Sequence, residues 1–378
     1  MAKNKKSINL HLALLLGTLT LVLLVQIAGL FPKVTTPIEQ MEYSARDLLM
    51  RLRGEQTPSE DIVIVAIDDE SFSGTGFQWP WPRSYFAEIV DQINAGGGKV
   101  IGVDIFLFEP DPKDGNDQIF ADALGKSTSA VNVLQILKKG DGQFTNFTLV
   151  QPLSPYRDIL DGTGITSFVR DEDAIIRSVQ AFDTYNGKTY YHWAFDIARL
   201  YLGVEPPSNP TSTSLQFNDQ VVPLNAGQLV VNFTGRAGTY PTYSAYSVAL
   251  GDVLEQDPDA FHDKIVLIGA TTVTLQDIYP TPYSAQNPTS GVEIIASTID
   301  TLINGAYITL APAWIALLIT LAAALLAYFI SFSKRPSVTV ILLLVSMSGY
   351  LIATFVVFAS SRFVLPVITP QAMLFLGV

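Results

Sequence analysis

Cysteine is absent from the 378-residue chain, and histidine occurs only three times. Without cysteine the chain has neither a disulfide framework nor a thiolate metal site. His11, His192 and His262 are widely separated in the sequence, and no H-E-x-x-H or G-x-S-x-G motif is present. We therefore expect no catalytic residue, no metal ligand and no cofactor within this chain.

The motifs that bind nucleotide phosphates are also incomplete. The segment AGGGKV has no Ser or Thr after Lys99, where a P-loop places one on magnesium. The segment GTGITS at 162–167 lacks the last glycine of a dinucleotide fingerprint. Neither segment predicts a nucleotide site.

Charge is missing from long stretches at both ends of the chain. All 35 acidic residues lie within 32–309, whereas 8–31, 310–332 and 338–359 carry no charge. Each of these runs is as long as the roughly 20 residues that a helix needs to cross a bilayer. The mean hydropathy of the whole chain is +0.31. We predict about four transmembrane helices, namely these three and the start of a fourth at 363–378, where the sequence stops before a full span.

The first uncharged run has a second interpretation. Lys3, Lys5 and Lys6 precede it, as in the basic region of a cleaved signal peptide. The apolar core of a signal peptide is shorter, about 7 to 15 residues, and ends in a small-residue cleavage site. The sequence therefore favours an uncleaved anchor over a cleaved signal.

The basic residues predict the orientation in the membrane. Lys334 and Arg335 lie between the second and third spans, and the positive-inside rule places this loop and residues 1–7 in the cytoplasm. Residues 32–309 then form an extracytoplasmic domain, and the chain is a multi-pass protein of the cell inner membrane. We expect it to be the front part of a longer protein whose remainder is cytoplasmic.

The extracytoplasmic segment is strongly acidic. All 35 acidic residues and all but six of the 23 basic residues lie in it, which gives a formal charge of −18. Such a domain repels nucleic acid and anionic lipid, so we expect no nucleic-acid partner. The charge either keeps the domain soluble or attracts divalent or organic cations.

Apolar, strand-like runs alternate with amphipathic helical patterns in this segment. Because the strands are apolar nearly throughout, we expect them to be buried on both faces. The pattern predicts an α/β fold in which helices cover both faces of a mostly parallel sheet. The expected strands are 62–67, 99–107, 130–137, 228–233 and 264–270, and the expected helices lie within 84–96, 116–126, 190–203 and 291–307.

Acidic residues occur at the ends of these strands, which is where open parallel sheets bind ligands. The nearby tryptophans either form the wall of a pocket or cover the edge of the sheet, and the nearby arginine is expected to pair with one of the acids. The candidate ligand-binding residues are Asp68, Asp69, Glu70, Trp79, Trp81, Arg83, Asp104 and Asp277.

Several segments together resemble the type-two CHASE domain. The resemblance covers residues 35–332 and implies an extracellular sensory module rather than an enzyme, of the kind found ahead of bacterial nucleotide cyclases, histidine kinases and serine/threonine kinases. Pro82 and Gly269 match its characteristic positions, whereas Ala174 stands where the family pattern has glycine. The resemblance implies no particular ligand set. The matching segments are IVIVAIDDESF, WPWPRSYFAEIVDQI, GGGKVIGVDIFLFEPD, DAIIRSV, KIVLIGATT and GVEIIASTIDTLING, followed by membrane spans.

We therefore expect a membrane receptor that passes an unknown extracytoplasmic signal to a cytoplasmic output domain. A class III adenylate or guanylate cyclase, which makes a cyclic nucleotide such as cAMP, is the first choice for that output. A histidine or serine/threonine kinase is the alternative output. An outer-facing, metal-dependent hydrolase that uses the acidic strand ends is the alternative from another functional class.

The segment after the first span predicts a helix with an apolar seam, whose members follow one another at spacings of three and four residues. The seam packs either on a second subunit or on its own domain. Because class III cyclases and histidine kinases resemble one another in working as dimers, we expect a homodimer with this helix near the two-fold axis. The seam consists of Ile38, Met41, Ala45, Leu48 and Leu52.

Overall fold

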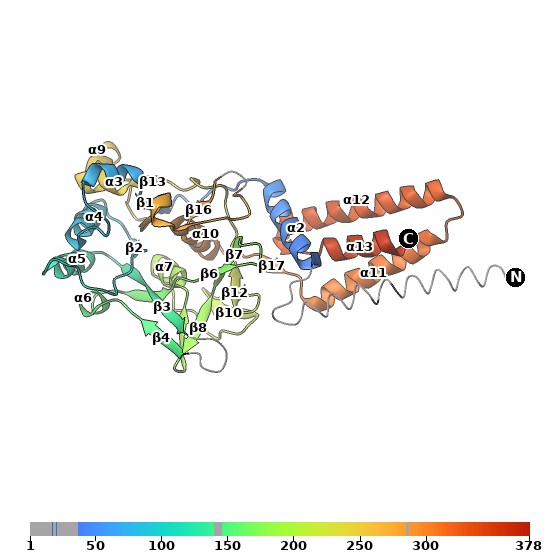
Figure 1. Ribbon diagram of the computed structural model, residues 1–378, viewed down its shortest axis with the longest axis horizontal. Helices are drawn as coiled ribbons and strands as arrows, with labels where there is room; N and C mark the ends of the chain where they lie inside the picture. The colour runs from blue at the N-terminus through green and yellow to red at the C-terminus, as the bar shows by residue number, and fades with distance from the viewer. Residues whose placement is uncertain (1–16, 18–19, 21–36, 140–145, 285–286) are drawn as a thin grey trace. The chain divides into compact units, whose positions relative to one another are not determined.

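The computed structural model describes residues 17, 20, 37–139, 146–284 and 287–378 (Figure 1). It contains two compact units. One is an α/β domain, Glu55–Tyr307, and the other is a helical unit that includes α2 (Pro37–Arg53) and the chain from Ile308 to Val378. The predicted span over 8–31 lies outside the described residues, apart from residues 17 and 20.

A seven-stranded sheet forms the centre of the α/β domain, in the order β13-β1-β14-β2-β3-β4, and β5 also pairs with β3. Every pair is parallel except β3 with β4, which is antiparallel. The prediction of a mostly parallel sheet is therefore confirmed. The strands are β1 (Ile62–Ile67), β2 (Val100–Val103), β3 (Ala130–Lys139), β4 (Asn146–Val150), β5 (Gly162–Ile165), β13 (Thr242–Ser244) and β14 (Ile265–Ala270).

The central strands are apolar throughout because both of their faces are covered. All six residues of β1 are buried, and alternate ones, beginning with Val63, belong to the core on one side of the sheet. The opposite side is packed just as closely, since a Cβ on Gly102 of β2 would lie 2.8 Å from Ile197 and 3.2 Å from Trp193. A strand packed on both faces has no solvated side for polar residues.

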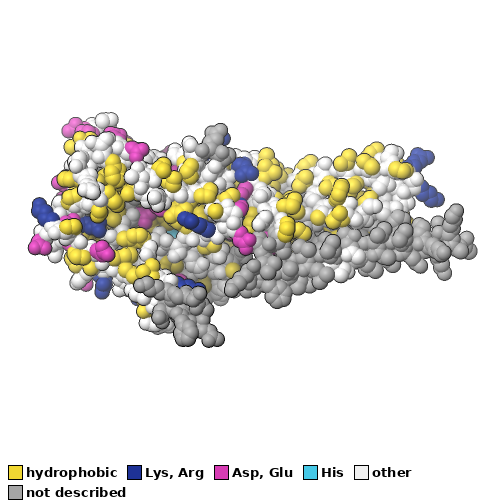
Figure 2. All heavy atoms as spheres, in the orientation of Figure 1, with side chains coloured by type: hydrophobic (Ala, Val, Ile, Leu, Met, Phe, Trp, Pro, Cys, Tyr) yellow, Lys and Arg dark blue, Asp and Glu magenta, His cyan; other side chains and the backbone are white. Residues whose placement is uncertain are grey.

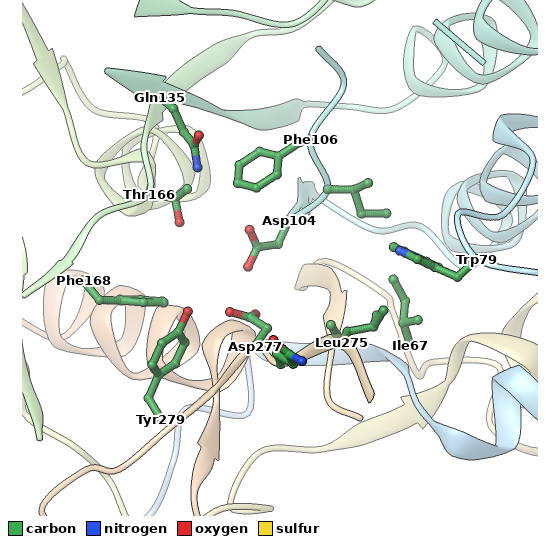
Figure 3. A pocket seen from close by; sticks show the side chains of 13 residues that line it. Ile67, Trp79, Asp104, Phe106, Gln135, Thr166, Phe168, Leu275, Asp277 and Tyr279 are labelled. Atoms are coloured by element: carbon green, nitrogen blue, oxygen red, sulfur yellow. The ribbon is translucent and has the colours of Figure 1, made fainter. Parts of the chain in front are cut away.

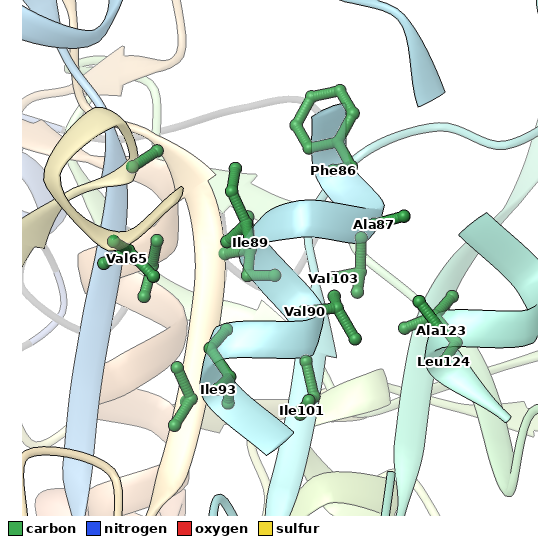
Figure 4. Close-up of a cluster of buried hydrophobic side chains, with 14 of the residues drawn as sticks. Val65, Phe86, Ala87, Ile89, Val90, Ile93, Ile101, Val103, Ala123 and Leu124 are labelled. Atoms are coloured by element: carbon green, nitrogen blue, oxygen red, sulfur yellow. The ribbon is translucent and has the colours of Figure 1, made fainter. Parts of the chain in front are cut away.

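Helices cover both faces of this sheet, as predicted. On one face lie α4 (Arg83–Ala95), α5 (Asn116–Leu124) and α8 (Ala245–Leu250). The other face is covered by α7 (Trp193–Leu202) and α10 (Gly291–Ile303). Figure 4 shows how α4 presents its apolar side chains, spaced three and four residues apart, to the strands. These buried α4 side chains include Phe86, Ile89, Val90 and Ile93.

The strand predicted over 228–233 does not join the central sheet. Only β12 (Gln228–Val230) is a strand, and it pairs antiparallel with β7 (Ile176–Gln180), which also pairs with β6 (Phe168–Arg170). A short apolar run indicates a buried strand but not which sheet it enters, so the sequence could not predict this.

The other short elements are α3 (Asp69–Thr75), α6 (Ser154–Arg157), β8 (Phe182–Tyr185), β9 (Lys188–Tyr191), β10 (Ser214–Phe217), β11 (Gln220–Pro223), α9 (Asp252–Gln256), η2 (Val273–Leu275), β15 (Ile278–Tyr279) and β16 (Thr289–Ser290).

Two helices of the other unit, α11 (Ala313–Ser331) and α12 (Pro336–Ser361), are the only ones among the described residues that are long and apolar enough to cross a membrane. They overlap the spans predicted over 310–332 and 338–359. Figure 2 shows hydrophobic side chains along these helices and basic side chains at the connection between them. Because the described residues contain two such helices, the prediction of about four is supported only in part.

The start of a fourth span, predicted over 363–378, stays a prediction. A short strand, β18 (Phe363–Val364), pairs with β17 (Thr309–Leu310), and the helix that follows, α13 (Ile368–Gly377), has ten residues. This helix is apolar and shorter than α11 and α12.

Candidate functional site

Three adjacent parallel strands, β1, β14 and β2, end at one edge of the central sheet. The strand predicted over 99–107 stops at Val103, so Asp104 directly follows the end of β2. The side-chain amide of Asn132 donates hydrogen bonds to the carbonyls of Val103 (2.7 Å) and Ile105 (2.9 Å). The chain after β2 is thus held in place by a side chain, which leaves Asp104 at the edge of the sheet.

A pocket of about 410 Å³ opens at this edge. Figure 3 shows the carboxyl groups of Asp104 and Asp277 pointing toward one another across the pocket, from the end of β2 and from the loop after β14. The middle of the pocket is therefore acidic, and its walls are aromatic or polar. The other lining residues include Trp79, Phe106, Gln135, Thr166, Phe168 and Tyr279.

The environment of the two carboxyl groups favours their neutral forms. Burial raises the pKa of Asp104 to about 8, and the facing carboxylate of Asp277 adds to the rise because like charges repel. Burial also raises the pKa of Asp277, whereas a hydrogen bond from the Tyr279 hydroxyl lowers it. At neutral pH Asp104 is therefore largely protonated, and its carboxyl group can both donate and accept a hydrogen bond.

Two glycines allow the carboxyl groups to come this close to the sheet and to α10. A Cβ on Gly291, the first residue of α10, would lie 2.3 Å from Oδ2 of Asp277. A Cβ on Gly269 in β14 would lie 2.7 Å from Cβ of Val292 and 3.3 Å from Cβ of Asp104. Larger residues at either position would displace the carboxyl groups or the helix beneath them.

Aromatic residues from separate elements form the walls. The rings of Phe168 in β6 and Tyr279 in β15 meet edge to face, with centroids 5.0 Å apart. The guanidinium of Arg170 lies 5.1 Å from the centroid of the Tyr279 ring. On the other side, Trp79 packs against Trp81 with centroids 5.5 Å apart. The sequence leaves open whether the tryptophans form a wall or cover the sheet, and the structure places Trp79 in the wall.

The first three predicted acids have partners outside the pocket. Asp68 caps α3, since its Oδ1 accepts from the backbone N–H of Ser71 (2.8 Å) and from the hydroxyl of Ser244 (2.9 Å). Asp69 accepts a hydrogen bond from the hydroxyl of Thr272. Glu70 follows Asp69 in α3, is exposed and accepts a hydrogen bond from the hydroxyl of Ser247 (3.4 Å). None of these three acids lines the pocket, so the predicted acidic edge is divided into two groups.

Trp81 and Arg83 also lie outside the pocket lining. Trp81 is only 1% exposed and belongs to the core beneath α4. The guanidinium of Arg83 donates to the carbonyl of Phe106 (3.0 Å), and its backbone N–H donates to Oδ2 of Asp111 (2.7 Å). Of the eight candidate residues, the pocket brings together Trp79, Asp104 and Asp277.

The sequence did not predict the remaining lining residues. Thr166 directly follows β5, and it could have been predicted if GTGI at 162–165 had been recognised as a strand that ends at the same edge. Phe168 and Tyr279 lie in short strands of two small sheets, and no periodicity in the sequence marks them.

Within the part of the chain that the structure describes, no group of three or more His, Asp or Glu side chains is arranged to hold a metal ion. The pocket therefore has two carboxyl groups, several neutral hydrogen-bonding groups and four aromatic side chains to offer a ligand. This composition suits a small molecule held by hydrogen bonds, charge and ring contacts.

The family model described as "CHASE2 domain" matches residues 18–329, which is more than half of the chain. Comparisons with curated proteins and with solved structures give no match.

Proposed function

The chain belongs to the CHASE2 domain family, and on this premise we propose that it is the input half of a bacterial inner-membrane receptor. CHASE2 domains are extracellular sensory domains of receptors. In this proposal the α/β domain is extracytoplasmic and binds a signal molecule. The membrane helices pass the resulting conformational change to a cytoplasmic output domain.

The observation that carries the proposal is the pocket at the carboxyl edge of the sheet. Ligands of open α/β sheets bind outside the carboxyl ends of the strands, and Asp104 and Asp277 converge there from different loops. A volume of about 410 Å³ lies within the range of small-molecule sites. The α/β domain therefore offers a place for a small signal molecule.

For the output domain we propose a class III adenylate or guanylate cyclase, with a histidine or serine/threonine kinase as the alternative. We further propose that the receptor is a homodimer. Both kinds of output can be regulated by a change in the relation of two subunits. A ligand that prefers one of two dimer geometries tenfold shifts their balance by about 1.4 kcal/mol.

A hydrolase is the second candidate function, because Asp104 and Asp277 form a carboxyl pair in which the pKa of Asp104 is raised to about 8. Such pairs serve as acid and base in glycoside hydrolysis. Loss of a hydrolytic activity of the whole chain in both Asp104→Asn and Asp277→Asn would favour this function over the receptor.

Topology provides the test of the receptor proposal. A fluorescent reporter fused after Arg335 should be active, because it lies in the cytoplasm. Alkaline phosphatase inserted at Asn186–Gly187, in the turn between β8 and β9, should be active, because that turn lies outside. An insertion at 140–142, outside the described residues, should give the same result. Inactive alkaline phosphatase at both insertion sites would place the α/β domain in the cytoplasm and would contradict an extracytoplasmic sensor.

A further inference from the structure

Building on the proposed function, we propose that the pocket between Asp104 and Asp277 binds a small organic cation of the alkylammonium class. The ammonium group would lie between the two carboxyl groups, and its carbon chain would lie against the aromatic walls. Three properties of the pocket support an alkylammonium ligand. They are its charge, the chemistry of its walls and the small number of side chains that could coordinate a metal ion.

The two carboxyl groups lack a cationic partner within the described residues. No lysine or arginine in this part of the chain forms an ion pair with Asp104 or Asp277. Arg170 is directed to the ring of Tyr279 and is not among the residues that line the pocket. A cation placed between the carboxyl groups would lower the pKa of both, because each ionised carboxylate would be attracted to it, and it would offset the repulsion between the two charges.

The walls suit a cation that carries carbon. Trp79, Phe106, Phe168 and Tyr279 line the pocket, and the negative faces of aromatic rings attract organic ammonium groups. Figure 3 shows Ile67 and Leu275 beside Trp79 on one side of the carboxyl pair and Tyr279 beside Phe168 on the other. The pocket thus provides apolar surface for a chain as well as charge for a head group.

A divalent metal ion fits the pocket less well. Calcium takes six to eight oxygen ligands, often from several carboxylates, whereas the pocket supplies two carboxyl groups. No group of three or more acidic or histidine side chains suited to a metal occurs in the described parts of the chain. An anionic ligand would be repelled by the ionised form of either carboxyl group.

The test compares choline with 3,3-dimethyl-1-butanol, which has the same shape but carries carbon in place of the charged nitrogen. Binding to the whole 378-residue chain in lipid nanodiscs is measured by isothermal titration calorimetry, with putrescine as a second cation and calcium chloride and succinate as competitors. We expect at least one cation to bind at least tenfold more tightly than the neutral alcohol.

Variants locate the binding. Asp104→Asn and Asp277→Asn keep the size of the side chain and should each weaken cation binding at least tenfold. Asp91→Asn makes the same charge change on the exposed face of α4, outside the pocket, and should leave binding unchanged. Trp79→Leu leaves both carboxyl groups in place and should weaken binding by removing a ring.

The possible outcomes separate the ligand class from the proposed function. Equal binding of choline and its neutral analogue, binding of calcium or succinate alone, or binding that Asp104→Asn and Asp277→Asn do not change would each overturn the cation proposal. If succinate or the neutral alcohol binds and Trp79→Leu abolishes that binding, the sensory pocket stands and only the ligand class fails. If no probe binds and both reporter insertions are cytoplasmic, the proposed function fails as well.

Discussion

At the scale of single residues, two features depend on backbone position rather than on residue type. Asp104 is one of many acids in the sequence, yet its place after β2 and opposite Asp277 makes it the one whose pKa is raised to about 8. Ala174 is an ordinary residue with an unusual backbone conformation, φ = 64°. Each leads to a prediction about stability.

The stability of the wild-type chain should fall, relative to Asp104→Asn, as pH rises. The pKa of Asp104 is about 8 in the folded protein, against an ordinary value of 3.8, so the folded state binds this proton more tightly than the unfolded state. The stability that this tighter proton binding gives the folded state is fully present below about pH 4 and is lost as pH rises through about 8. Each pKa unit corresponds to about 1.4 kcal/mol, and we expect the difference between the two chains to change by at least that amount between pH 5 and pH 9.

Thermal unfolding of both chains, followed by tryptophan fluorescence, measures this difference. Asp91→Asn serves as the matched control, because the side chain of Asp91 is 51% exposed and pairs with Lys126. Its melting curve should follow that of the wild type across the pH range. Melting temperatures of Asp104→Asn and wild type that differ by the same amount at every pH would contradict the prediction.

Ala174→Gly should stabilise the α/β domain by about 1 kcal/mol. Ala174 lies in a turn, and its left-handed conformation brings Cβ close to the backbone. The turn is tied down by Arg177, which is 2% exposed and bonds to Asp171 and Asp173 at 2.7 Å each, so the backbone cannot relax. Chemical denaturation should show this increase in the free energy of unfolding.

The control for this substitution is Ala249→Gly, which places the same change in the regular helix α8. There glycine should cost about 1 kcal/mol, because it adds freedom to the unfolded chain and has no strain to relieve. A loss of stability in both variants would show that the turn at Ala174 carries no strain.

At the scale of elements, a carboxylate of α2 binds the N-terminus of α13. Glu42 in α2 accepts hydrogen bonds from the backbone N–H groups of Val367 (2.8 Å), Ile368 (2.8 Å) and Thr369 (3.0 Å). These are the first amides of α13, which has no side-chain cap of its own. A carboxylate stabilises a helix N-terminus by hydrogen bonding and by interaction with the helix dipole. The two helices can therefore transmit displacement to one another.

Glu42→Gln should loosen the N-terminus of α13. The amide is neutral and has one acceptor oxygen in place of two, so we expect a loss of about 1 to 2 kcal/mol at this contact. Hydrogen exchange of the amides of Val367, Ile368 and Thr369 should become about tenfold faster for each 1.4 kcal/mol lost. Glu42→Asp keeps the charge and should have a smaller effect. Unchanged exchange in Glu42→Gln would show that the contact contributes nothing.

At the scale of the whole molecule, the apolar seam of α2 remains available to a second subunit. Met41, Leu48 and Leu52 are 54%, 49% and 59% exposed, Ile38 and Ala45 are half-buried, and Leu49 and Met50 are buried. Three of the five seam residues are thus exposed, whereas the buried residues Leu49 and Met50 do not belong to the seam. This exposure supports the proposed homodimer.

Single cysteines in this cysteine-free chain test the dimer. Met41→Cys and Leu48→Cys should form cross-links between subunits in membranes, because they lie on the seam, and Ile38→Cys should follow the same helical period. Leu49→Cys is the matched control, since this position is 6% exposed and should not cross-link. Absence of cross-links at all three seam positions in membranes that hold active full-length protein would exclude this interface.

The sequence by itself determined the elements whose burial follows a regular period. Strands β1 and β14, the apolar face of α4 and the helices α11 and α12 could be predicted because each repeats one chemical pattern over many residues. The family could be predicted for the same reason, from segments that together form a specific pattern.

The tertiary structure decided which acids share a site. Asp68 accepts a hydrogen bond from Ser244 because β13 lies beside β1, and the sequence did not predict this strand of three residues. Asp104 and Asp277 meet because β14 is inserted between β1 and β2, although the two acids are far apart in the chain. Strand order arises from packing between distant segments, and a local sequence pattern contains no information about which strands become neighbours.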